Sequence, residues 1–295
     1  MHQNILDYKG RRYFTISALL TVACIVLFFT QGERQPANGG TWQGYVLGTL
    51  GAALILWLMA LGIRKRRYSS RLGSVSGWVS AHVYLGSALL IIAALHCAFQ
   101  FGFNIHTLAF VLMTVVILSG FFGLYAYMRY PKVASANRVN KPRTALFEEL
   151  SQLNTNVRRL SKKCDGEIQR TVESAIERTA IGGGLITQVF ALDGSQIINL
   201  DGNPSKDGAL IDNKDQKTVI DLVATKIPRA RKQGQASILQ DILSMLCRRQ
   251  ALLRRIRKDI QLQGLMQIWL LVHIPLSLAL LFALTGHIVA VFFYW

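Results

Sequence analysis

The chain has 295 residues, of which 51% are hydrophobic, and its 33 Lys and Arg against 16 Asp and Glu give a formal net charge of +17. A soluble domain this apolar seldom carries so much basic charge, and a nucleic-acid-binding protein is normally less apolar. The apolar content excludes a disordered chain, and four Cys are too few for a disulfide scaffold. The composition therefore predicts a membrane protein with basic segments outside the bilayer and no nucleic-acid partner.

Five uncharged stretches are long enough to cross about 30 Å of hydrocarbon as helices, which takes roughly 20 residues. None of them has Lys, Arg, Asp or Glu in its interior. No A-x-A cleavage site follows the first stretch, so we expect a retained span there and not a signal peptide. The predicted spans are residues 13–30, 42–63, 77–99, 107–129 and 267–293.

The basic residues predict an orientation. The loop 64–71 is strongly basic, whereas the loop after the first span holds only Glu33 and Arg34, and segment 100–106 holds no charge. Every Lys and Arg except Arg34 thus lies on one side, which the positive-inside rule makes cytoplasmic. We expect a multi-pass protein of the plasma (inner) membrane, with the N-terminus inside and the aromatic C-terminus, 292–295, at the outer interface.

Residues 131–266 form one long insertion before the last span, which we expect to be cytoplasmic. Two runs of apolar residues follow a spacing of three and four that is typical of a coiled-coil seam. They favour an antiparallel helical pair, serving either as a solvated stalk or as a docking site for a cytoplasmic partner. The runs are Leu150, Leu153, Val157, Leu160 and Cys164, then Leu239, Ile242, Leu246, Leu253, Ile256 and Ile260, the second interrupted by Arg249.

Between these two helices, after Gly182–Gly184, the alternation in LITQVFALDGSQIINL predicts a β-hairpin that turns at Asp193–Gly194. Basic residues near the last span are expected to contact anionic lipid. These residues are Arg248, Arg249, Arg254, Arg255, Arg257 and Lys258.

Together these features predict an all-α membrane protein: a five-span helical bundle with a cytoplasmic, coiled-coil-like helical hairpin that carries a small β-hairpin at its tip. The predicted divisions are 1–130 for the first four spans, 131–266 for the insertion and 267–295 for the fifth span, which completes the bundle.

Four of the six His lie in spans that are otherwise free of ionisable side chains. His82 and His96 lie on the third span, and His273 and His287 lie on the fifth, each pair 14 residues apart. Fourteen helical residues rise about 21 Å and return to within about 40° of the starting face. Each of the two helices therefore presents two imidazoles on one face, at two depths.

The third and fifth spans run in the same direction, so His82 matches His273 in depth and His96 matches His287. Neutral imidazole is a suitable axial ligand for haem iron, and two facing pairs are what two bis-His haems need. Small residues one turn from each His leave room for a flat porphyrin. These are Gly86, Ala93, Ser277 and Ala283.

The remaining candidates in the spans have simpler interpretations. Gly44 and Gly48 on the second span form a small-xxx-small pattern, which we assign to close helix packing. His2 and His106 stand outside the paired pattern and are expected at the surface, where His106 could meet an outer electron partner or a quinone.

The paired H-x13-H spacing on two parallel spans resembles that of the membrane di-haem b-type cytochromes. These include the cytochrome b of quinol–cytochrome c reductases and the transmembrane domains of ferric reductases and NADPH oxidases; placement on the third and fifth spans is most similar to the ferric reductases. The resemblance implies two haem b cofactors, with His82 and His273 as iron ligands of the inner one and His96 and His287 of the outer one.

The sequence has no C-x-x-C-H motif, no iron–sulfur spacing of Cys and no glycine-rich dinucleotide fingerprint. We therefore expect an electron-transfer subunit of an oxidoreductase complex rather than a stand-alone enzyme. It would carry electrons across or within the membrane, between a quinone or a redox protein subunit and another redox partner. The alternatives are a haem-free receptor or scaffold acting through the stalk, and a proton-coupled transporter, against which the lack of intramembrane carboxylates counts.

Overall fold

The computed structural model describes residues 5–31, 37–66, 73–198, 208–230 and 233–293. Predictions that concern His2, Glu33, Arg34, Arg67, Arg71 or residues 294–295 fall outside these ranges.

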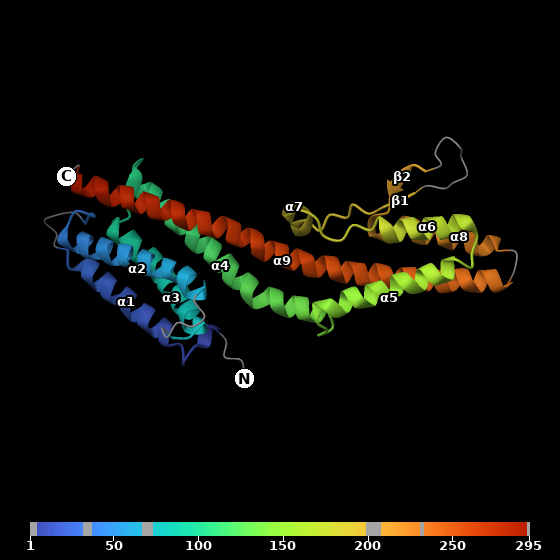
Figure 1. The fold of residues 1–295 in the computed structure, drawn as a ribbon. Coiled ribbons are helices and arrows are strands. Elements are labelled where there is room, and N and C mark those ends of the chain that lie inside the picture. Colours follow the sequence, from blue (N-terminus) through green and yellow to red (C-terminus); the bar gives the residue numbers. More distant parts are fainter. Residues whose placement is uncertain (1–4, 32–36, 67–72, 199–207, 231–232, 294–295) are drawn as a thin grey trace. The chain divides into compact units, whose positions relative to one another are not determined.

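The described part is almost wholly helical (Figure 1), which confirms the predicted all-α class. Five helices are long and apolar enough to span a bilayer, namely α1, α2, α3, α4 and α9. The α-helices are α1 Arg12–Phe29, α2 Trp42–Arg66, α3 Val75–His96, α4 Ile105–Asn137, α5 Arg143–Ser161, α6 Gly166–Glu177, α7 Leu185–Val189, α8 Lys217–Lys226 and α9 Gln233–Phe293. Short 3₁₀ helices are η1 Ile5–Asp7, η2 Lys214–Gln216 and η3 Ile227–Arg229, and the strands are β1 Gln196–Ile198 and β2 Leu210–Asp212.

The chain divides into two compact units. The apolar unit comprises Met1–Ala126 and Trp269–Trp295, and the insertion unit comprises Tyr127–Ile268. Helices α4 and α9 each contribute residues to both units. The boundaries predicted after residues 130 and 266 fall a few residues from these divisions.

The apolar unit turns large hydrophobic side chains outward as well as inward. On α1, for example, Leu19 is 66% exposed and Val26 59% exposed, and similar side chains cover the other long helices. Exposing so extensive an apolar surface is unfavourable in water and favourable in the hydrocarbon of a bilayer. Inside the unit, α3 packs against α1 and α2 (Figure 1) through buried Ala88 and Ile92, as expected of a multi-pass membrane protein.

The insertion unit is built on the predicted helical pair. Helix α5 runs antiparallel to α9, since Arg143 donates to Gln263 at 2.5 Å while Arg248 donates to Glu149 at 3.1 Å (Figure 1). The predicted seam positions lie in two apolar cores of this unit, and burying them is what makes the pair stable. Those buried below 10% exposure are Leu150, Leu153, Val157, Leu239, Ile242, Leu246, Leu253, Ile256 and Ile260.

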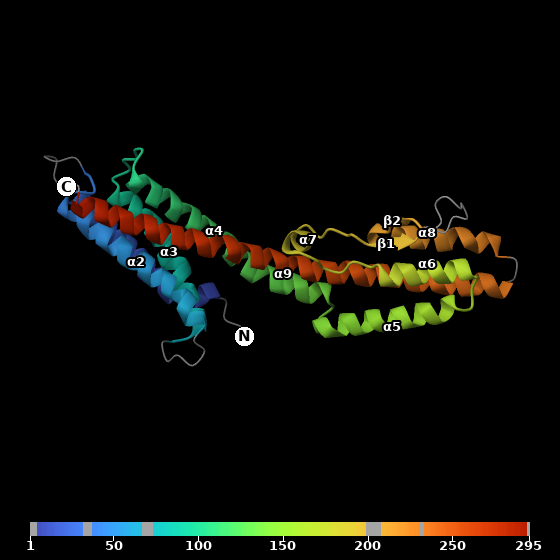
Figure 2. The same ribbon diagram turned by 45° about the horizontal axis from the view of Figure 1, so that its top comes forward.

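The predicted hairpin is wrong. Residues 185–189 form helix α7, and β1 pairs instead with β2, with Ile197 opposite Ile211 in antiparallel register (Figure 2). Asp193 does not occupy a hairpin turn; its carboxylate accepts hydrogen bonds from the backbone N–H groups of Ser195 at 3.0 Å and Asp215 at 2.6 Å. The small sheet therefore pairs β1 with β2 and does not use the turn predicted at Asp193–Gly194.

Candidate functional site

The four membrane histidines all lie in the apolar unit, and the structure brings the rings of two of them close together. The ring centroids of His96, at the end of α3, and His287, on α9, are 6.0 Å apart with the ring planes at 73°. Two imidazoles on opposite sides of one metal ion, each at about 2 Å, have centroids about 6 Å apart. The separation therefore fits a pair that shares one metal ion.

Hydrogen bonds from the Nδ1 atoms determine which ring nitrogen is available. His96 Nδ1 lies 2.8 Å from the Gly44 carbonyl oxygen, and His82 Nδ1 lies 3.1 Å from the Leu58 carbonyl oxygen. A carbonyl only accepts, so both Nδ1 atoms carry hydrogen and both Nε2 atoms keep a free lone pair. A ligand histidine in a metal site is typically held in this way, with its other nitrogen donating to a backbone carbonyl.

His273 is held by a serine instead. Its Nδ1 lies 2.6 Å from the Ser119 hydroxyl on α4, and that hydroxyl donates its one hydrogen to the Val116 carbonyl at 2.8 Å. His273 must then donate from Nδ1, which again leaves Nε2 free. The indole of Trp269 donates to the Ser119 carbonyl at 2.8 Å and ties α9 to α4 at this point. Sequence spacing contained no signal for Ser119.

Two glycines lie against the His96 ring. A Cβ added to Gly48 would lie 2.7 Å from His96 Cε1, and one added to Gly39 would lie 3.4 Å from the same atom. Gly44 and Gly48 thus lie where α2 packs on α3, as assigned: the Gly44 carbonyl accepts the His96 hydrogen bond and Gly48 makes room for the ring. The sequence shows two glycines four residues apart, but it does not show that they lie against His96.

His106 lies at the same site. Its ring centroid is 4.3 Å from that of His287, and its side chain is partly exposed, so it lies beside the His96–His287 pair. The buried Nδ1 of His287 has no hydrogen-bond partner among the described residues. His287 is thus the one ligand candidate whose tautomer the protein does not determine through a hydrogen bond within the described ranges.

The second predicted pair is not in contact. In the described part of the chain, no ring contact joins His82 to His273, although both are oriented with Nε2 free. The small residues that were predicted to leave room for a porphyrin have different surroundings. A Cβ on Gly86 would meet only Leu58 Cδ1, at 3.9 Å, while Ser277 donates to the His273 carbonyl at 2.8 Å. Ala93 is half-buried and Ala283 is buried.

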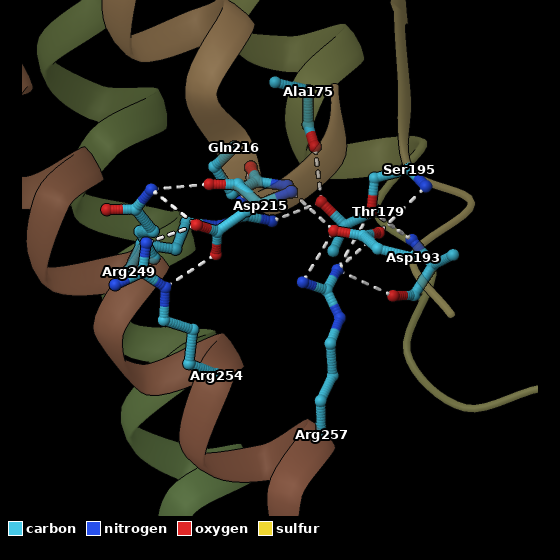
Figure 3. A network of polar contacts seen from close by, with 11 residues as sticks. Ala175, Thr179, Asp193, Ser195, Asp215, Gln216, Arg249, Arg254 and Arg257 are labelled. Atoms are coloured by element: carbon cyan, nitrogen blue, oxygen red, sulfur yellow. Dashed lines mark hydrogen bonds and ion pairs between the residues drawn. The ribbon is translucent and has the colours of Figure 1, made fainter. Parts of the chain in front are cut away.

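A polar network occupies the insertion unit, where three arginines of α9 reach toward η2 and the loop that follows α6 (Figure 3). Arg249 is 1% exposed, and its guanidinium donates to Asn154 at 2.7 Å, to Thr179 at 2.8 Å and to Gln216. Burial lowers the pKa of Arg249 to about 10, so the guanidinium stays charged at neutral pH. Among the described residues, this guanidinium donates hydrogen bonds only to uncharged oxygen atoms.

Carboxylates pair with the other arginines of the network. Arg257 donates to Asp193 at 2.8 Å, and Arg254 donates to Asp215 at 2.7 Å. Asp215 and Gln216 both have positive φ, 52° and 58°, a conformation that non-glycine residues adopt at a cost. The contacts from α9 hold this strained pair in place.

The polar network determines which of the basic residues near the last span are accessible to lipid. Arg249 cannot meet lipid because it is buried, and Arg257 is only 11% exposed in its ion pair with Asp193. Arg248 pairs with Glu149 and Arg254 pairs with Asp215. Burial therefore keeps Arg249 and Arg257 from lipid, while the other four basic residues of the run stay exposed.

Acid should weaken the insertion unit through Asp215. The hydrogen bond from Arg254, together with nearby positive charge, lowers the pKa of Asp215. A carboxylate with a lowered pKa stabilises the fold at neutral pH, and this contribution is lost as the pH falls below about 4. We expect the protection factors of the α8 amides, which are corrected for the slower intrinsic exchange in acid, to fall at pH 3.5, with a smaller fall in Asp215→Asn. An equal acid effect in that variant would contradict the assignment.

No group of three or more His, Cys, Asp or Glu within the described ranges is placed to hold a metal ion by protein ligands alone. A bis-His haem needs only two ligands from the protein, because the porphyrin supplies the other ligands of the iron. Comparison of the chain with protein-family models, curated proteins and solved structures found no match.

Proposed function

We propose that this chain is a di-haem b-type cytochrome, an electron-carrying subunit of a membrane oxidoreductase complex. The observation that carries the proposal is the His96–His287 pair, with ring centroids 6.0 Å apart and His96 Nδ1 bound to the Gly44 carbonyl. His96 and His287 would hold one haem. His82 and His273, whose Nε2 atoms are also free, would hold the other.

Bound haem supplies a one-electron redox centre, and the chain's residues supply its environment. Gly44, Leu58 and Ser119 orient the imidazoles and keep Nε2 unprotonated, and a hydrogen bond at Nδ1 also raises the basicity of the ligand. The apolar side chains around the histidines limit the access of water. Both effects set the redox potential of a bound iron.

The proposal extends to orientation and partners. The basic insertion would lie in the cytoplasm and the C-terminus outside the plasma membrane, as the positive-inside rule favours. An electron carrier needs a donor and an acceptor, which would be redox subunits of the same complex or a quinone. The sparsely charged outer loops favour the quinone pool or a permanently docked subunit over a soluble partner steered by charge.

Gly48→Ala should disturb the outer pair selectively. The new methyl group would lie 2.7 Å from His96 Cε1, so the ring must move and weaken its hydrogen bond to Gly44. We expect loss of the outer haem, measured as haem per polypeptide in the purified chain. Gly62→Ala, on the same helix, is the matched control, because its methyl group would meet nothing within 4 Å. Equal haem loss in the two variants would contradict a specific role for Gly48.

Ser119→Ala should change the inner centre without emptying it. His273 would lose the acceptor for Nδ1, which makes it a weaker donor to ferric iron. A hydrogen bond of about 1 kcal/mol corresponds to about 40 mV, so one of the two midpoint potentials should rise by roughly that amount. Ser87→Ala is the control, since Ser87 donates only to the Val83 carbonyl. Unchanged potentials in a redox titration of Ser119→Ala would refute the role given to Ser119.

Ligation can be tested by low-temperature electron paramagnetic resonance of the oxidised full-length chain. Two low-spin ferric signals of the bis-imidazole type are expected, because each iron would have a nitrogen ligand on both sides. High-spin signals would contradict bis-His ligation. A protein that binds no haem would favour the alternative, a receptor or scaffold that acts through the insertion unit.

A further inference from the structure

Helix α7 and the residues directly after it expose apolar side chains in the insertion unit. Ile186 is 68% exposed, Phe190 68% and Leu192 57%, and we call these three side chains the α7 patch. They lie within residues 180–192, a run of the insertion without a single Asp, Glu, Lys or Arg. Isolated exposed hydrophobics are ordinary, but three within seven residues of an uncharged segment suggest an apolar partner.

Contacts with α9 determine the level of the patch along that helix. The side chain of Gln261 donates to the Val189 carbonyl at 3.0 Å. A Cβ added to Gly264 would lie 3.2 Å from Gln188 Cβ and 3.5 Å from Val189 Cγ2. The absence of a side chain at Gly264 therefore lets α7 pack closely on α9, immediately before Phe190.

That level is close to the start of the membrane-spanning part of α9. The helix continues without a break from Gly264 into the apolar run that begins near Ile268, four residues or about 6 Å further on. The headgroup layer of a bilayer is about 5–8 Å thick on each side of the hydrocarbon. With the hydrocarbon boundary near Ile268, a side chain beside Gly264 would fall within the headgroup layer, where aromatic residues such as Trp269 are favoured.

We propose that the α7 patch inserts into the membrane interface on the side of the insertion unit. The partner is the lipid surface itself. Burial of Ile186, Phe190 and Leu192 among acyl-chain ends would stabilise this contact through the hydrophobic effect. Exposed Arg255 and Lys258, on the preceding two turns of α9, lie outside the ion pairs of the network and suit anionic headgroups. The proposal does not depend on haem.

The test uses the full chain in nanodiscs of phosphatidylcholine and phosphatidylglycerol, with its four free Cys replaced by Ser. A bimane label is attached at Phe190→Cys, and quenching by lipids that carry a shallow doxyl group is measured. Leu271→Cys, 62% exposed on the spanning part of α9, is the positive control. Lys163→Cys is the negative control; it is exposed and follows the end of α5, which runs about 27 Å from Arg143, the residue that contacts Gln263.

We expect doxyl quenching at Phe190→Cys to approach that at Leu271→Cys and to exceed that at Lys163→Cys at least threefold. Phosphatidylglycerol should strengthen the quenching. Quenching no greater than at Lys163→Cys, with ready access to aqueous iodide, would overturn the proposal. Protection from both quenchers with disulfide formation between copies would also overturn it, because the patch would then cover a second chain. Unchanged helicity in circular dichroism shows that the labelled variants are folded.

Discussion

His96→Leu is expected to lower the haem content of the purified chain from two per polypeptide to about one. The substitution removes the imidazole whose ring centroid is 6.0 Å from that of His287, and it leaves the Gly44 carbonyl without its hydrogen-bond donor. Leucine is apolar and fits a membrane helix, so the fold should persist. The remaining haem, held by His82 and His273, should keep its own midpoint potential within the error of a redox titration.

His106→Leu is the matched control for this variant. His106 is even closer to His287, with ring centroids 4.3 Å apart, yet this spacing is too short for two ligands on opposite sides of one iron. The His106 variant should therefore keep both haems. Loss of one haem from His106→Leu, with both retained in His96→Leu, would mean that the outer ligands are assigned wrongly.

Arg249→Ala is expected to destabilise the insertion unit by about 3–5 kcal/mol, the sum of a cavity and several unsatisfied hydrogen bonds. The guanidinium joins α9 to Asn154, Thr179 and Gln216, which come from three other segments. Gln216 is fully buried and has positive φ, so loss of its partner should also release the strained pair at residues 215–216. Amide exchange of α5 and α8 in the full-length chain should accelerate at least a hundredfold.

Two further variants test which property of Arg249 stabilises the insertion unit. Arg249→Lys keeps the positive charge but offers one nitrogen in place of the planar fork, and we expect it to recover little of the lost stability. Arg248→Ala removes a neighbouring arginine that is 68% exposed and pairs with Glu149, and its effect should stay below about 1 kcal/mol. Similar exchange rates in the Arg248 and Arg249 variants would contradict the central role of Arg249.

Sequence periodicity predicted the parts of this structure that repeat along one helix. The spans are recognisable because they lack charge over about 20 residues. The α5–α9 seam follows from its spacing of three and four. The approach of His96 to His287 was predicted from two equal spacings on two parallel helices, and the structure has these rings 6.0 Å apart.

Features that depend on contacts between distant segments could not be predicted in this way. Ser119 and His273 are 154 residues apart, so no local pattern relates them. Arg249 looked like a charged break in an apolar seam, because its acceptors come from residues 33 to 95 positions away. Asp193–Gly194 has the composition of a hairpin turn, but the Asp193 carboxylate is used by Arg257 and by the backbone of Asp215.

The most direct test of the cytochrome proposal is a haem assay of the purified full-length chain, expressed with haem supplied. Haem per polypeptide would be determined as the pyridine haemochrome, alongside a dithionite-reduced minus oxidised absorbance spectrum. The proposal predicts two b-type haems per chain, because the four membrane histidines would supply two sets of axial ligands. A colourless, folded protein would contradict it and would leave the receptor or scaffold as the better account of the chain.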